Sequence, residues 1–108
     1  MTLHKIADEV HAEIHRAWVK FGPQYNLPDG ADPALYAAAA DVQKQIVDNS
    51  ALSGTLGWAD ILLEEVYEAI AEPDPARLRA ELLQVAAVAM RWIDTIDVRA
   101  RMGEGGAL

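Results

Sequence analysis

The stretch Trp58–Ile96, WADILLEEVYEAIAEPDPARLRAELLQVAAVAMRWIDTI, decides the fold because it contains two helix-forming segments separated by a clear break. The break is EPDP at positions 72–75. Proline cannot lie inside a helix, so the first segment must end there. Aspartate followed by proline starts a helix, because aspartate is a good N-cap and proline suits the first helical position. The stretch therefore predicts a helical hairpin with arms at about 56–72 and about 75–101.

Acidic residues recur at helical spacing on both arms of this hairpin. Glu65 and Glu68 are three positions apart, as are Glu81 and Gln84, so each pair shares a helix face. Opposite residues of an antiparallel hairpin have a constant sum of position numbers, which places Glu68 opposite Glu81 and Glu65 opposite Gln84. Crowded carboxylates repel and raise each other's pKa, and a bound cation removes that repulsion. The hairpin therefore predicts a site for a divalent cation, and Mg²⁺ is such a cation that prefers oxygen ligands.

The Glu-Glu-x-x-Glu motif that ends at Glu68, followed by Glu81-x-x-Gln84, resembles the signature of MazG-like all-α nucleoside triphosphate pyrophosphohydrolases. The resemblance covers about positions 55–97. It implies that Glu65, Glu68 and Glu81 hold Mg²⁺, or alternatively Mn²⁺. Gln84 occupies the fourth ligand position, where the family usually has aspartate. An amide oxygen can bind Mg²⁺ but adds no negative charge to the site.

The resemblance also implies an activity. A nucleoside triphosphate, in its ribo or deoxy form, would be hydrolysed to the monophosphate and pyrophosphate in a Mg²⁺-dependent reaction. Glu64 or Glu68 would act as the catalytic base that takes a proton from the attacking water. Two alternatives stay open. One is a nucleotide- or metal-binding helical module without turnover, and the other is a structural helical dimer with solvated acids.

Further polar and aromatic side chains are candidates for substrate binding. Gln24 and Asn26 lie in the loop 22–32, which resembles a base-surrounding region of related enzymes, although their amides could instead bind the loop backbone. Trp58 could stack on a base or pack in the core. Lys44 and Arg77 could neutralise phosphate charge, and a solvated surface position is the alternative for Lys44.

Two more helices are expected before the hairpin. Apolar residues recur at helical spacing over positions 2–21, and a second Asp-Pro start signal at 32–33 opens a helix over about 33–50. The apolar stripe of that second helix is expected at Leu35, Ala39, Val42 and Ile46. Thr55 is the expected N-cap of the third helix. The chain thus predicts an all-α fold, a four-helix bundle-like MazG fold, with one domain at 1–102 and a flexible C-terminal tail at 103–108.

Composition narrows the class of protein further. The 108-residue chain is 52% hydrophobic, has a formal net charge of −8 and contains no cysteine. The acidic balance argues against binding a nucleic-acid polymer, and the absence of cysteine excludes disulfides. No signal-peptide pattern opens the sequence and no apolar run could span a bilayer, so we expect a cytoplasmic protein without membrane contact.

The residues Leu82–Met90 are apolar almost all round the expected fourth helix, apart from Gln84. A helix that has no polar face is surrounded by protein. Three partner helices of this size cannot surround it completely. The sequence therefore predicts at least a homodimer, or a higher homo-oligomer.

Overall fold

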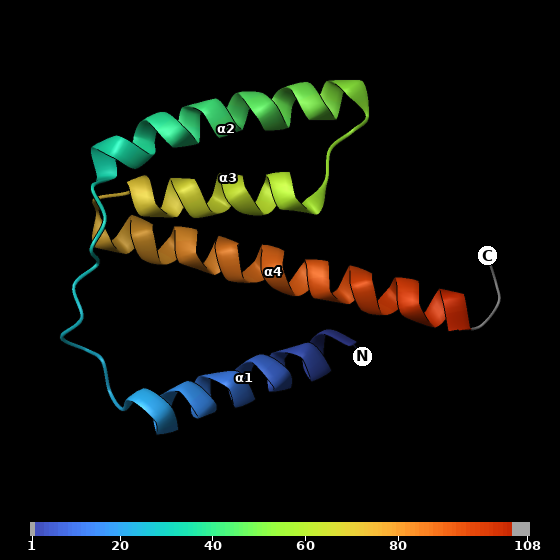
Figure 1. The fold of residues 1–108 in the computed structure, drawn as a ribbon, viewed down its shortest axis with the longest axis horizontal. Helices are drawn as coiled ribbons and strands as arrows, with labels where there is room; N and C mark the ends of the chain where they lie inside the picture. The colour runs from blue at the N-terminus through green and yellow to red at the C-terminus, as the bar shows by residue number, and fades with distance from the viewer. Residues whose placement is uncertain (1, 105–108) are drawn as a thin grey trace. The chain divides into compact units, whose positions relative to one another are not determined.

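The computed structural model describes residues 2–104, apart from the side chains of Thr2 and Glu104, and this part of the chain is all-helical (Figure 1). The four helices are α1 Thr2–Phe21, α2 Pro33–Ser53, α3 Trp58–Ala71 and α4 Pro75–Glu104. The all-α prediction is confirmed. Residues 103 and 104 of the expected tail belong to α4, and residues 105–108 lie outside the described part.

Both Asp-Pro signals start helices as predicted. Asp32 Oδ1 accepts a hydrogen bond from the backbone N–H of Ala34 at 3.0 Å, and Pro33 is the first residue of α2. Asp74 Oδ2 accepts from the backbone N–H of Arg77 at 3.0 Å at the start of α4. Each aspartate thereby satisfies a backbone donor that the first turn of a helix leaves free.

The junction between α2 and α3 differs from the prediction, because Thr55 is not the cap of α3. Its backbone N–H instead donates to the carbonyl oxygen of Ser50 at 2.9 Å, which commits Thr55 to the end of α2. Helix α2 consequently runs three residues further than expected. The N-cap of α3 is Gly57, whose N–H donates to Asp60 Oδ2 at 3.2 Å.

The chain forms two compact units, each described by itself. We call residues 1–29 and 90–108 the terminal unit and residues 30–89 the central unit. The terminal unit contains α1 and the C-terminal half of α4, while the central unit contains α2, α3 and the N-terminal half of α4. The expectation of a single domain at 1–102 stays a prediction.

In the central unit, α2 packs along α3. The rings of Tyr36 and Tyr67 lie 6.3 Å apart between centroids. The buried side chain of Gln43 donates from Nε2 to the backbone oxygen of Asp60 at 3.0 Å. These two pairs have the same sum of position numbers, so they define one antiparallel register between the helices.

The face that α2 presents to α3 shares only Ala39 with the predicted stripe. Ala39 is half-buried, but the other three stripe residues, Leu35, Val42 and Ile46, are exposed. Gln43 is buried instead, and Val47 is half-buried. The prediction failed because α2 carries apolar residues on more than one face, including the alanines at 37–40. An apolar pattern of that kind does not single out the face that packs.

In the terminal unit, Ile6 of α1 is fully buried. Gly22 ends α1 with a positive φ of 69° and donates its N–H to the carbonyl oxygen of Trp18 at 2.8 Å. The ring of Trp18 meets that of Tyr25 edge to face, 5.9 Å apart between centroids. Within residues 2–104, none of the helices combines the length and the apolar character that a membrane span requires.

Candidate metal centre

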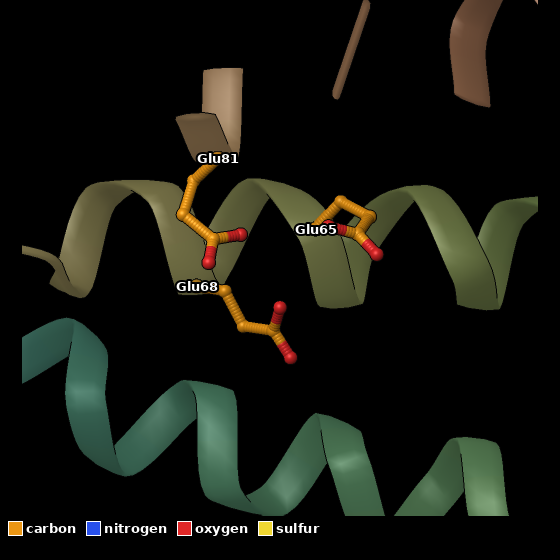
Figure 2. Close-up of side chains that lie close together, drawn as sticks. All are labelled: Glu65, Glu68 and Glu81. Atoms are coloured by element: carbon orange, nitrogen blue, oxygen red, sulfur yellow. The ribbon is translucent and has the colours of Figure 1, made fainter. Parts of the chain in front are cut away.

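Three carboxylates meet in the central unit (Figure 2). Glu65 and Glu68 extend from α3 and Glu81 extends from α4. One carboxylate oxygen from each residue lies within 4.8 Å of the other two, and all three residues are half-buried. The structure thus brings together the three residues that the hairpin register aligned, and their role as metal ligands stays a prediction.

The short connection between α3 and α4 fixes the register between the two helices. Helix α3 ends at Ala71, and the side chain of Glu72 accepts a hydrogen bond at Oε1 from the backbone N–H of Asp74 at 3.1 Å. Asp74 then caps α4. Glu81 follows within two turns of the start of α4, as Glu68 lies within two turns of the end of α3. The short link therefore sets which carboxylates come opposite each other.

The electrostatics of the cluster are unfavourable for ionised carboxylates. The pKa of Glu68 is raised from 4.5 to about 7, mainly by burial, then by the charges of Glu65, Glu64 and Glu81 and by a hydrogen bond with Glu64. The pKa of Glu65 is also raised, first by burial and then by the charges of Glu81 and Glu64. A large share of Glu68 is therefore protonated near neutral pH. A cation held by the same oxygens would favour the ionised form.

Glu64 lies half-buried beside the cluster. Its Oε2 is buried, and no donor in the described part of the chain reaches it when both Glu64 and Glu68 are ionised. A proton on Glu68 changes this, because the Glu68 carboxyl can then donate to Glu64. The register between α2 and α3 puts Glu64 level with Ala39, a small half-buried residue. The role of Glu64, as the catalytic base or as a group that orients Glu68, stays a prediction.

The two remaining candidates on α4 are both exposed. Gln84 lies one turn after Glu81, and Arg77 lies one turn before it, so all three project from one side of the helix. The assignment of Gln84 as fourth ligand, and that of Arg77 to a phosphate, stay predictions.

The other predicted substrate-binding residues belong to three different segments of the chain. Gln24 and Asn26 are exposed in the terminal unit, in a turn closed by a 3.0 Å hydrogen bond from the Leu27 N–H to the Gln24 carbonyl oxygen. Lys44 is exposed on α2, and Trp58 is half-buried at the first position of α3. The roles of these four residues stay predictions.

Sequence reasoning missed one residue that supports this centre. Gln43 is the buried polar side chain that ties α2 to α3 through the carbonyl of Asp60. A polar residue flanked by apolar positions on a helix is the signal that could have revealed it. None of the family models, curated proteins or solved structures compared with this chain matches it. The resemblance to the MazG-like family therefore rests on the acidic motif itself.

Proposed function

We propose that the chain adopts a MazG-like fold and is a Mg²⁺-dependent nucleoside triphosphate pyrophosphohydrolase, which converts an NTP or dNTP to the monophosphate and pyrophosphate. One observation carries this proposal. The carboxylates of Glu65, Glu68 and Glu81 converge from two helices, with one oxygen of each within 4.8 Å of the others. The pKa values of Glu65 and Glu68 are raised. A divalent cation bound by these carboxylates would offset the repulsion between their negative charges.

The donor set fits magnesium. Carboxylate oxygens are hard ligands, and Mg²⁺ in nucleotide enzymes is commonly held by few carboxylates together with water and substrate phosphates. Mn²⁺ accepts the same ligands. When bound, the cation would polarise phosphate oxygens and lower the pKa of a ligating water. Glu65, Glu68 and Glu81 would hold it, with the Gln84 amide oxygen as a fourth, uncharged ligand.

The protein's own groups have distinct roles in this proposal. Glu68, or Glu64 beside it, accepts the proton of the water that attacks phosphorus. In the metal-free protein, Glu64 accepts a hydrogen bond from the protonated carboxyl of Glu68. Arg77 and Lys44 neutralise charge on the phosphates, while Trp58 contacts the base.

A second candidate function is a nucleotide- or metal-binding module without turnover. The observation that favours it is Gln84, which replaces a carboxylate and is exposed. A site with fewer anionic ligands binds a hard cation more weakly. Binding could then persist while hydrolysis is lost.

One assay separates the two functions. Purified protein is incubated with Mg²⁺ and each of several nucleoside triphosphates, and the products are resolved as monophosphate or diphosphate. The proposal expects monophosphate and pyrophosphate from the wild type, no product in chelator, and a loss of at least about 100-fold in Glu68→Gln. Glu9→Gln, which removes the same charge from an exposed site on α1, is the matched control and should remain active. Nucleotide binding without any product would favour the module.

We also propose that the chain acts as at least a homodimer. Leu82 and Leu83, in the stretch expected to meet a second subunit, are exposed on α4. Val88 in the same stretch is buried within the chain. Part of the apolar stretch is thus already covered within the chain.

A further inference from the structure

The three histidines of the chain all lie on helix α1, at positions 4, 11 and 15. His11 and His15 are four positions apart, so their side chains leave neighbouring turns on the same side of α1, with Cβ atoms roughly 6 Å apart. We call these two residues the histidine pair. Within residues 2–104, neither ring of the pair has a hydrogen bond or an ion pair. The ring nitrogens of both residues are therefore available to a ligand.

The histidine pair points away from the side of α1 that packs within the terminal unit. Ile6 marks the packed side, because it is fully buried and lines a hollow together with Ile93 of α4. At about 100° per residue, His15 is turned by roughly 180° from Ile6, and His11 by roughly 140°. Both histidines are accordingly exposed. The packing of α1 on α4 leaves both imidazoles accessible within the terminal unit.

Two imidazoles at this spacing can chelate a transition-metal ion. Zinc–nitrogen bonds are about 2.0–2.1 Å long, and side chains on neighbouring turns of a helix can bring two ring nitrogens to one ion at that distance. Zinc metalloproteases use the same spacing, with two histidine ligands four positions apart on a helix. Imidazole suits Zn²⁺, Cu²⁺ and Ni²⁺, whereas Mg²⁺ prefers oxygen. The histidine pair thus selects a different class of ion from the carboxylate cluster.

The charges near the pair favour a cation. Asp8 lies one turn before His11 on the same side of α1, so its carboxylate adds negative charge there. A carboxylate in that position can also accept the N–H of a ligating imidazole and so orient the ring. Arg16 follows His15 directly, but its guanidinium is paired with Glu13. The positive charge closest in sequence to the pair is therefore offset.

The residues around the pair fit binding rather than hydrolysis. In the part of the chain that the structure describes, the carboxylate cluster is the one group of three potential ligands whose atoms lie within 4.8 Å of one another. The pair would thus supply two ligands, and water would complete the coordination. The catalytic glutamate of the zinc-protease motif follows the first histidine directly, where this chain has Ala12.

We infer that His11 and His15 form a binding site for a divalent transition-metal ion, such as Zn²⁺, on α1. The bound ion joins two neighbouring turns and stabilises the helix. Both ligands belong to one helix, so no other element has to be in place for them to reach the same ion. The site uses neither the glutamates of the carboxylate cluster nor a nucleotide, and it therefore lies outside the proposed hydrolysis.

The test is a Zn²⁺ titration of the full chain, followed by NMR signals of the histidine rings, in an excess of Mg²⁺ that occupies the carboxylate cluster. The chain has three histidines, so each ring can be assigned. The signals of His11 and His15 should move along one binding curve, while that of His4 stays in place. His11→Gln and His15→Gln each leave one imidazole and should raise the Zn²⁺ dissociation constant at least about tenfold. His4→Gln is the matched control and should stay within about twofold of the wild-type value.

A second readout guards against misfolding of the variants. Glutamine is a good helix former, so the helical circular dichroism signal should be unchanged in all three variants. Zn²⁺ should raise the melting temperature of the wild type and of His4→Gln more than that of His11→Gln.

Several outcomes would overturn the inference. They are a wild type whose rings do not respond up to about 1 mM Zn²⁺, an equal response of all three rings, and equal weakening by His4→Gln and His11→Gln. Glu68→Gln separates this site from the carboxylate cluster, because its histidine rings should respond to Zn²⁺ as in the wild type, whatever its activity. Loss of that response in Glu68→Gln would place the ion at the glutamates instead.

Discussion

Glu68→Gln should make the metal-free protein more stable while it removes the stabilisation by Mg²⁺. The pKa of Glu68 is raised from 4.5 to about 7, chiefly by burial and by the charges of Glu65, Glu64 and Glu81. At 1.36 kcal/mol per pKa unit, this shift means that folding disfavours the ionised form of Glu68, relative to its protonated form, by at most about 3 kcal/mol of free energy. Glu68 is half-exposed, and solvent screening at such a position reduces the expected effect to about 1 kcal/mol.

Glutamine keeps the size of the side chain and removes its charge. Its amide can also donate to the buried Oε2 of Glu64, which lacks a donor when Glu68 is ionised. In chelator at about pH 8, Glu68→Gln should therefore be stabilised by about 1 kcal/mol, which raises the melting temperature by about 4–8 °C for a domain of this size. In Mg²⁺ at about 100 times its dissociation constant, the wild type should gain about 2.7 kcal/mol, and the variant should gain little.

The assay is thermal unfolding followed by circular dichroism, at one fixed protein concentration because self-association shifts the melting temperature. Glu68→Ala separates the two contributions, since it removes the charge without supplying a donor to Glu64. Glu9→Gln, at an exposed position of α1, should behave as the wild type in both conditions. A Glu68→Gln protein that is less stable than the wild type in chelator, or that gains as much from Mg²⁺, would refute the reasoning.

Three further predictions follow from the same contacts. Because folding raises the pKa of Glu68 from 4.5 to about 7, its contribution to metal-free stability is complete below about pH 4.5 and is lost as the pH rises to about 7. The difference in melting temperature between Mg²⁺ and chelator should therefore increase as the pH rises from about 4.5 to about 7. A difference that stays constant over this pH range would contradict the prediction. Gln84→Asp adds a fourth carboxylate, so it should tighten Mg²⁺ binding in calorimetry and lower the melting temperature in chelator. If neither quantity changes with metal, Gln84 is not a ligand. Gln43→Leu should destabilise the fold by about 1 kcal/mol in urea unfolding, because the hydrogen bond between Gln43 of α2 and the carbonyl of Asp60 in α3 is lost, whereas Gln45→Leu at an exposed position of α2 should have little effect.

Local features of the sequence were sufficient to predict the four helices and the carboxylate cluster. The Asp-Pro signals at 32–33 and 74–75 act within one helical turn, and both caps occur as expected. The three-residue spacing of Glu65 and Glu68 depends only on helix geometry, and the short link after α3 sets the level of Glu81. Each of these relations involves residues that are close in sequence, so the pattern alone determines them.

Tertiary structure decided what depends on contacts between distant segments. Helix α2 has apolar residues on several sides, and only its packing on α3 shows that Gln43 faces inward while Leu35, Val42 and Ile46 of the predicted stripe are exposed. Thr55 could have capped α3 on sequence grounds, yet its hydrogen bond to Ser50 assigns it to the end of α2. The raised pKa of Glu68 likewise arises from burial and from charges on two helices. Burial and electrostatic environment depend on which helix faces meet, and a helical pattern with more than one apolar face does not specify that choice.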